Sequence, residues 1–344
     1  MRRFPVRLLA LGVLPAALLA GCGSSKSNAT GSSSSASTSA SSSSSATTTS
    51  IAPQDVSPMS AIKVNNPNSS NPTITLGKKP FQVNKTTVDV LTKGTGATVG
   101  ADQVAVVNYA VADGASGKML TQTFTTPVPI YMKDPSQFPG LITALKNVKV
   151  GTAETVAIPP ADGFGTSGNS TYGIAPTDTL VFYMKVTAAT NPLVSGTDAA
   201  PKSGFPTVKM NGPASPATIT MPDANPPKTL ESQNLINGTG ATVKKGQTLI
   251  VAYTGVVWVN GKAGTLFDST GSRAGAPASF VIGEGQVITG WDKTLVGKKV
   301  GDRVLIVVPP ADGYGSKGQT NSSGQTIIKG TDTIVFVVDI LGVG

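Results

Sequence analysis

The sequence predicts an α+β fold in which one antiparallel β domain, with a single short helix, occurs twice. Several stretches alternate apolar and polar residues and end at Gly, Pro, Asn or Asp, as half-buried strands do. Three short motifs occur twice in the same order, which indicates an internal repeat. The 39 Gly and 25 Pro residues among 344 also favour turn-rich β structure over helix bundles.

The repeated motifs keep nearly constant spacing, so each copy is expected to form a whole domain. They lie at Gly94–Val99 and Gly238–Val243, Pro159–Gly165 and Pro309–Gly315, and Asp178–Phe182 and Asp332–Phe336. Between the copies, residues 191–227 are rich in Pro, Gly, Ser and Asn and contain the connection. The segments Pro72–Thr75 and Pro206–Lys209 are candidates for equivalent first strands. We therefore expect domains at 72–190 and 205–344, joined by a linker at 191–204.

Alternation and helical spacing place the elements of the second copy. Leu249, Val251 and Tyr253 alternate as on a strand, and so do the runs beginning at Val304 and Ile334. A different period marks one segment, where Val287, Trp291 and Leu295 recur every four residues, as on one face of a short helix. Gly297 is expected to end this helix.

The N-terminus has the pattern of an export signal. A basic start with Arg2, Arg3 and Arg7 precedes an apolar run that is too short to span a bilayer and is interrupted by Pro15. The run ends in Leu-Ala-Gly-Cys at Cys22, which resembles the lipobox of bacterial lipoproteins, whose cysteine is lipidated. We expect a signal peptide at 1–21 and a lipid anchor at Cys22 that holds the protein on the extracytoplasmic face of the cell membrane. An ordinary signal peptide with a chance cysteine is the alternative.

Residues 22–71 are expected to be a disordered tether between membrane and domains. From residue 23 to residue 50 the chain is nearly all Ser, Thr, Ala and Gly, which bury too little apolar area to fold.

Composition excludes several kinds of site. The chain has no histidine and one cysteine, so it lacks a Ser-His-Asp triad, a disulfide framework and a cysteine-based metal site. The formal net charge is +9, but the basic residues are scattered among acidic ones, which does not indicate a nucleic-acid partner. Two G-x-G-x-x-G matches, at Gly163–Gly168 and Gly313–Gly318, follow Pro-Pro pairs and are expected to be loops, not dinucleotide sites.

Five short motifs follow one another in the second copy, and each contains an aromatic residue. They are Tyr253–Gly255, Leu266–Ser269, Val287–Trp291, Pro310–Gly315 and Thr333–Phe336. In their order and spacing they resemble the FKBP-type peptidyl-prolyl cis–trans isomerases. The resemblance implies a twisted antiparallel sheet wrapped around a short helix, with the pocket between them. It implies no cofactor and no metal.

The resemblance also implies the roles of individual residues. Trp291 would form the pocket floor and Tyr253, Phe267 and Phe336 its aromatic walls. Val287 and Ile288 would lie at the helix entry, where the Ile288 N–H meets a substrate carbonyl. Asp268 and Tyr314 would supply polar groups at the rim, and Phe280 and Ile328 would complete the substrate site. The alternative is that these aromatic residues are ordinary core.

Two features depart from the family pattern. Ala278 stands where the family often has an aromatic residue, and the polar loop from Gly318 to Gly324 lacks the usual Ile-Pro pair. The expected partners are proline-containing polypeptides and the family's macrolide inhibitors, but these departures bear on substrate preference and macrolide affinity.

The first copy keeps fewer of these residues. It retains Tyr109, Ile174 and Phe182, but Leu141 matches Trp291 and Phe164 matches Tyr314. Leu120 and Thr121 match Phe267 and Asp268 approximately. We expect residues 73–190 to fold like the second copy with little or no isomerase activity, as a spacer, a dimerisation surface or a chaperone-like client-binding module.

The sequence thus predicts an enzyme that isomerises X-Pro bonds of extracytoplasmic proteins. A reaction without proton transfer suits a chain that has no histidine, since rotation about an X-Pro bond breaks no bond. The alternative is a non-catalytic immunophilin-like binding or chaperone module on the cell surface.

Overall fold

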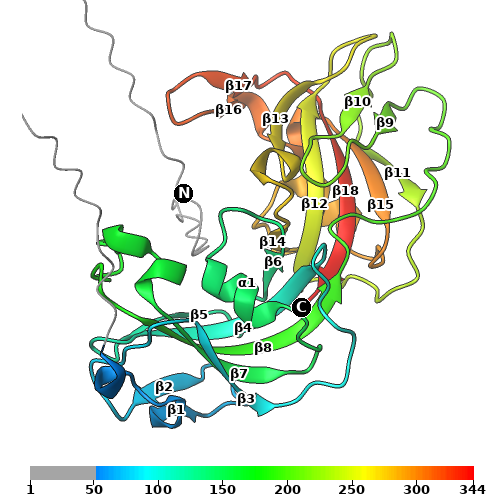
Figure 1. The fold of residues 1–344 in the computed structure, drawn as a ribbon. Coiled ribbons are helices and arrows are strands. Elements are labelled where there is room, and N and C mark those ends of the chain that lie inside the picture. Colours follow the sequence, from blue (N-terminus) through cyan, green and yellow to red (C-terminus); the bar gives the residue numbers. More distant parts are fainter. Residues whose placement is uncertain (1–51) are drawn as a thin grey trace, which may run out of the picture.

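The computed structural model describes residues 52–344 and contains two similar β domains (Figure 1). The signal peptide, Cys22 and the Ser/Thr/Ala-rich segment predicted before residue 51 lie outside the described residues. Within residues 52–344, no helix is long and apolar enough to cross a membrane.

The first domain is built on a six-stranded antiparallel sheet. Its strands run in the order β3-β7-β8-β4-β5, with β6 paired to β4. A single α-helix, α1 (Pro139–Leu145), packs on the inner face of this sheet. The strands are β3 (Thr87–Thr92), β4 (Val104–Asp113), β5 (Met119–Gln122), β6 (Val128–Tyr131), β7 (Ala153–Ile158) and β8 (Leu180–Thr190).

The second domain repeats this topology strand for strand. Its order is β11-β15-β18-β12-β13, with β14 paired to β12, and α2 (Thr289–Leu295) packs on the inner face. The strands are β11 (Glu231–Ile236), β12 (Thr248–Val257), β13 (Thr265–Ser269), β14 (Ala278–Val281), β15 (Arg303–Val308) and β18 (Ile334–Val343). The predicted α+β repeat and the three predicted strand runs are confirmed.

The short helix of the second domain begins two residues later than the spacing of Val287, Trp291 and Leu295 predicts. Trp291 and Leu295 are buried on α2, but Val287 precedes it and Ile288 is its N-cap. Gly290 allows close packing, because a Cβ there would lie 2.7 Å from Cγ1 of Val308. Gly297 follows the helix with a φ of +88°, a conformation that favours glycine.

Each domain also carries an N-terminal β-hairpin that covers the outer face of its sheet. In the first domain, β1 (Ile62–Asn65) pairs with β2 (Thr73–Leu76). In the second, β9 (Thr207–Lys209) pairs with β10 (Thr218–Thr220). Their inward side chains, Ile74 and Ile219 among them, are buried against the outer sides of the two sheets.

These hairpins correct two sequence predictions. The predicted tether extends too far, because residues 52–71 include β1 and the 3-10 turns Pro53–Asp55 and Met59–Ala61. The proposed equivalence of Pro72–Thr75 with Pro206–Lys209 is also wrong. The first segment contains the start of β2, the second strand of its hairpin, whereas Thr207–Lys209 is the first strand of the other. Such three- or four-residue strands carry too little alternation to be distinguished by sequence.

The remaining short elements lie in loops around the sheets. Residues Pro160–Asp162, Gly165–Ser167, Pro310–Asp312 and Gly315–Lys317 form 3-10 turns, so both G-x-G-x-x-G matches are loops, as predicted. A fifth turn, Gly271–Arg273, follows β13. The hairpin of β16 (Gln319–Thr320) and β17 (Thr326–Ile328) projects from the second domain (Figure 1).

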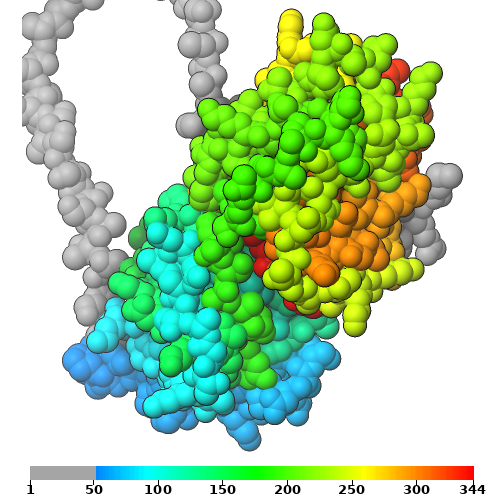
Figure 2. Space-filling model, turned by 90° about the vertical axis from the view of Figure 1, so that its right-hand side faces the viewer, coloured from blue at the N-terminus to red at the C-terminus, as the bar shows by residue number. Residues whose placement is uncertain are grey.

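The two domains meet through equivalent parts of their sheets. Val106 of β4 and Ile250 of β12 lie in one buried apolar cluster with Ala252 and Leu341. Ser279 Oγ of β14 donates a hydrogen bond to the Pro127 carbonyl, 3.2 Å away, next to β6. In the space-filling view the C-terminal residues, coloured red, lie at this junction between the halves (Figure 2).

Candidate functional site

The predicted aromatic residues of the second domain come together on the inner face of its sheet. The buried indole of Trp291 is the centre of the cluster and has near-perpendicular ring contacts with three neighbours. The ring centroids of Tyr253, Phe280 and Phe336 lie 5.3, 5.4 and 5.3 Å from it, respectively. Phe267 meets Phe336 at 5.5 Å and 88°. Edge-to-face pairs of this kind are favourable and fix the ring orientations.

Several different elements supply this aromatic cluster. Tyr253 comes from β12, Phe267 from β13, Phe280 from β14 and Phe336 from β18, whereas Trp291 stands on α2. Val287, Ile288 and Tyr314 are half-buried against the same core, and Ile328 is fully buried there. Nine of the ten residues predicted for the site therefore belong to one apolar cluster. The tenth, Asp268, lies at the rim of this cluster and accepts a hydrogen bond from Tyr253.

Gly255 is required for the close approach of two of these rings. A Cβ at this position would lie 2.7 Å from Phe267 and 2.7 Å from Phe336. The sequence contained Gly255 in the Tyr253–Gly255 motif but gave no reason for it. Its role is visible only when the register pairs Gly255 with both Asp268 and Phe336.

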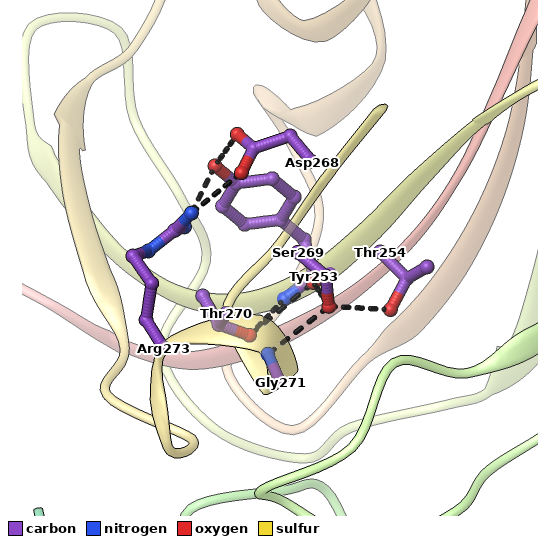
Figure 3. A network of polar contacts seen from close by, with 7 residues as sticks. All are labelled: Tyr253, Thr254, Asp268, Ser269, Thr270, Gly271 and Arg273. Atoms are coloured by element: carbon purple, nitrogen blue, oxygen red, sulfur yellow. Dashed lines mark hydrogen bonds and ion pairs between the residues drawn. The ribbon is translucent and has the colours of Figure 1, made fainter. Parts of the chain in front are cut away.

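A polar triangle forms the rim of the cluster (Figure 3). The Tyr253 hydroxyl donates to Oδ2 of Asp268, and Nη1 of Arg273 forms an ion pair with Oδ1 of the same carboxylate. Nη2 of Arg273 also donates to the Tyr253 oxygen at 3.1 Å. The guanidinium carbon lies 5.7 Å from the centre of the Tyr253 ring, a cation–π contact.

Arg273 is the functional residue that sequence reasoning missed. It lies in the Gly271–Arg273 turn, five positions after Asp268, in a stretch without periodicity. A basic residue shortly after an acidic one was the only signal for it.

Backbone hydrogen bonds hold the triangle in register (Figure 3). The Tyr253 N–H donates to Thr270 Oγ1 at 3.0 Å, and Ser269 Oγ donates to the Tyr253 carbonyl at 3.0 Å. Gly271 N donates to Ser269 Oγ at 3.0 Å, which starts the turn that carries Arg273. The network thereby fixes Asp268 and Arg273 relative to Tyr253.

Burial raises the pKa of both phenol groups of the site, which are neutral already at an ordinary tyrosine pKa of 10.0. Desolvation, and then the nearby Asp268 charge, raise the pKa of Tyr253 far above its ordinary value. The same two causes raise the pKa of Tyr314. Both phenols are therefore neutral hydrogen-bond donors at any physiological pH.

Three donors near the cluster are unpaired among residues 52–344. The Trp291 Nε1 atom is buried without an acceptor. The Ile288 N–H and the Tyr314 hydroxyl likewise have no hydrogen-bond partner in the described part of the chain. A bound polypeptide carbonyl offers an acceptor to the two donors on half-buried residues, at Ile288 and Tyr314. No group of side chains in residues 52–344 is arranged to hold a metal ion.

The corresponding face of the first domain is filled differently. Tyr109 and Phe182 keep the edge-to-face contact, with centroids 5.7 Å apart. Leu141 replaces the indole on α1 and is buried. Phe138, which is the N-cap of α1 as Ile288 is of α2, packs edge-on against Phe164 at 4.8 Å.

The first domain also lacks the polar triangle. Thr123 bonds the Tyr109 backbone as Thr270 bonds Tyr253, so Thr121 stands where Asp268 stands in the other domain. Burial, with a contribution from Tyr172, raises the pKa of Tyr109 to about 12. This tyrosine therefore remains neutral but has no carboxylate partner.

Comparison with known proteins gives the same family for both domains. The sequence profile of the FKBP-type peptidyl-prolyl cis-trans isomerases matches residues 96–187 and 240–341, more than half of the chain. An FK506-binding protein from Streptomyces anulatus is 36% identical over 125 residues, covering 36% of this chain and 94% of that protein. FK506-binding protein 15 from Homo sapiens is 40% identical over 110 residues, 32% of this chain and 8% of that protein.

Among solved structures, FkpA from Escherichia coli is 33% identical and matches with a TM-score of 0.28, covering 33% of this chain and 47% of that one. From its two profile matches and its curated relatives, this chain belongs to the family of FKBP-type peptidyl-prolyl cis–trans isomerases and carries the family domain twice.

Proposed function

We propose that the second domain isomerises X-Pro bonds by binding the proline ring over Trp291, inside the cluster of Tyr253, Phe280 and Phe336. The observation that carries this is the pairing of the aromatic cluster with two open donors, the Ile288 N–H and the Tyr314 hydroxyl. Apolar rings suit the pyrrolidine ring, and the donors suit the carbonyls on either side of it.

An apolar site accelerates this reaction without an acid or a base. The barrier to rotation is about 18–20 kcal/mol because amide resonance holds the bond planar. The planar amide is more charge-separated than the twisted transition state, so a dry site destabilises the ground state more. The Ile288 N–H and the Tyr314 hydroxyl hold the flanking backbone while the bond turns.

The Tyr253–Asp268–Arg273 triangle orients the wall of the site in this mechanism. It fixes the Tyr253 ring at 5.3 Å from Trp291 and holds Asp268 at the rim. The first domain lacks the triangle and the indole and has Phe138 at the helix entry. We propose that it contributes little or no turnover.

The test is the rate of cis-to-trans exchange of a short X-Pro peptide with the full chain and with a Trp291→Leu, Asp268→Thr variant, which copies the first domain. The wild-type chain is expected to accelerate exchange, and the folded variant is expected to be near the uncatalysed rate. A folded wild-type chain without acceleration for any residue before proline overturns the proposal and favours a non-catalytic binding module.

We further propose that Cys22 is lipidated and that the domains act on proteins folding outside the cytoplasmic membrane. The lipobox-like Leu-Ala-Gly-Cys and the low-complexity segment after it support this. Metabolic labelling with radiolabelled palmitate is the test. Label and membrane association are expected to be lost in Cys22→Ser, and an unlabelled wild-type protein contradicts the anchor.

A further inference from the structure

The edge strands β3 and β11 occupy the same place in the two sheets and differ in what lies beside them. Each pairs with one neighbour, β7 or β15, and each ladder shifts register near its end. The shift falls between Val90 and Thr92 in β3 and between Asn234 and Ile236 in β11. Leu91 therefore holds the position in the first domain that Leu235 holds in the second.

In the second domain, the linker covers this edge with an extended segment. The Ala199 N–H donates to the Leu235 carbonyl at 2.8 Å. The side chain of Gln233 adds two hydrogen bonds to this contact. Its Oε1 accepts from the Lys202 N–H at 2.8 Å, and its Nε2 donates to the Ala200 carbonyl at 2.9 Å. Leu235 is only 4% exposed and packs in the outer apolar cluster that contains Phe205 and Ile219.

In the first domain, the turn Met59–Ala61 lies close to β3 but leaves the side chains of the equivalent edge exposed. Val88, Val90 and Leu91 are 38%, 47% and 49% exposed, and they are half of the large apolar side chains that lie exposed in residues 52–344. No hydrogen bond from another described segment reaches the backbone of β3 beyond its ladder with β7. Figure 1 places β3 at the outer end of the sheet, beyond β7.

An open edge of this composition is unusual for a protein that avoids aggregation. Edge strands are ordinarily protected by lysine, proline, a β-bulge or a covering segment, and of these β3 has only the register shift near its end. Within β3, Asp89 is the only charged residue, and it takes the place of Gln233. Unpaired backbone groups beside an apolar strip form a template for strand addition, in which main-chain hydrogen bonds supply affinity.

We propose that β3 binds an extended segment of a client polypeptide by strand addition, with small or apolar side chains opposite Leu91. The occupied edge of the second domain defines this chemistry, because Ala199 and Ala200 run along β11 in the same chain. The first domain is then a holding site for unfolded chains. This proposal rests on the proposed function in one respect, namely that the client is an unfolded protein that contains proline.

The experiment uses the full chain with Cys22→Ser and a permanently unfolded probe, reduced and carboxymethylated α-lactalbumin. Hydrogen exchange of the backbone amides is followed with and without the probe. Protection is expected to rise in residues 87–92, whereas residues 231–236 of the covered edge are expected to be unchanged. Unchanged exchange at 87–92 with the probe bound overturns the proposal.

Affinity measurements with two matched variants complete the test. Leu91→Lys is expected to weaken probe binding at least tenfold, because a charge replaces the apolar contact at the edge. Val296→Lys changes an apolar side chain of similar exposure, 36%, in the second domain and is expected to bind like the wild type. Equal affinity of the three proteins contradicts the proposal.

Two other occupants are distinguished by the same data. Protection of 87–92 without probe that rises with protein concentration assigns the edge to a second copy of the chain and overturns the proposal. If residues 87–92 are protected without probe at every protein concentration, and deletion of residues 23–51 removes this protection, then the edge is occupied by that segment. This result also overturns the proposal. The Trp291→Leu, Asp268→Thr variant is expected to bind the probe through β3 as the wild type does. Binding at β3 is therefore tested separately from isomerase activity, and either proposal can fail without the other.

Discussion

Arg273 connects the charge of Asp268 to the ring of Tyr253, and three contacts depend on it. The guanidinium donates to the carboxylate and to the hydroxyl and lies over the ring face. Its side chain is 37% exposed, so water screens part of each interaction. The residue therefore orients Tyr253 and contributes little to the stability of the fold.

Replacement of Arg273 by leucine is expected to lower kcat/KM for an X-Pro peptide about fivefold, which corresponds to about 1 kcal/mol. The loss comes from an unfixed Tyr253 ring and a rim carboxylate without its partner. Lys245→Leu is the control, because it removes an exposed ion pair with Glu284 away from the cluster. Equal activity of the two variants would show that the triangle does not orient the site.

Glu154 is the second residue with an unusual environment. It lies on β7 in the core of the first domain, fully buried, and neither carboxylate oxygen has a hydrogen-bond partner. Burial raises the pKa of Glu154 to about 7. The shared sheet topology places Val304 at the equivalent position, opposite Val338 as Glu154 is opposite Met184.

The raised pKa predicts that the free energy of unfolding depends on pH. In the unfolded chain a glutamate has a pKa of about 4.3, so the fold binds the proton more tightly. This contribution is fully present below that value and is lost as pH rises through about 7. The loss amounts to roughly 4 kcal/mol at about 1.4 kcal/mol per pKa unit.

Glu154→Val, which copies the second domain, is expected to flatten the fall in stability between pH 4.5 and pH 8 and to stabilise the protein at pH 8. Urea unfolding of wild type and variant across this range measures the difference. Parallel stability curves for the two proteins would refute the assignment of this pH dependence to Glu154.

At the scale of elements, the linker is held to the second domain by one buried ion-pair network. Arg303 on β15 is 5% exposed and binds Asp339 on β18 through two nitrogens, at 2.7 and 2.8 Å. It also binds Asp198 and the Val194 carbonyl of the linker, each at 2.9 Å. This network places Ala199 and Ala200 along β11.

Arg303→Met is expected to lower the free energy of unfolding by about 3–5 kcal/mol, because Asp339 is left as a buried charge without its partner. The double variant Arg303→Met, Asp339→Leu is expected to recover most of this loss. Chemical denaturation measures both. A single variant that costs less than about 1 kcal/mol would contradict a dominant role for the network.

The elements also show what sequence alone predicts. Strands such as β12 and β18 are ten residues long and mostly apolar, and the aromatic positions follow from motifs in a fixed order, so both were predictable. Only one strand of each covering hairpin was predicted, at Pro72–Thr75 and Pro206–Lys209, because these strands have three or four residues amid Pro, Gly and Asn. Arg273 and Gly255 depend on how β12, β13 and β18 meet, and sequence spacing does not carry that information.

At the scale of the whole molecule, two copies of one domain have taken different side chains on a shared framework. The sheets, helices and outer hairpins correspond, and the copies meet through Val106 and Ile250 from equivalent strands. The inner faces differ, with an aromatic cluster and polar triangle in one and Phe138 with Leu141 in the other. The edge strands differ as well. Among residues 52–344, the apolar side chains of β3 in the first domain are exposed, whereas Leu235 of β11 in the second domain is buried.

The most direct measurement compares the exchange rate of one X-Pro peptide with two matched variants of the full chain, Phe336→Leu and Phe182→Leu. These phenylalanines hold equivalent positions, each in contact with the corresponding tyrosine of its domain, Tyr109 or Tyr253. The account predicts a loss of at least tenfold in kcat/KM for Phe336→Leu and an unchanged value for Phe182→Leu. A loss of activity confined to Phe182→Leu, or equal losses in both, would contradict the claim that catalysis belongs to the second domain.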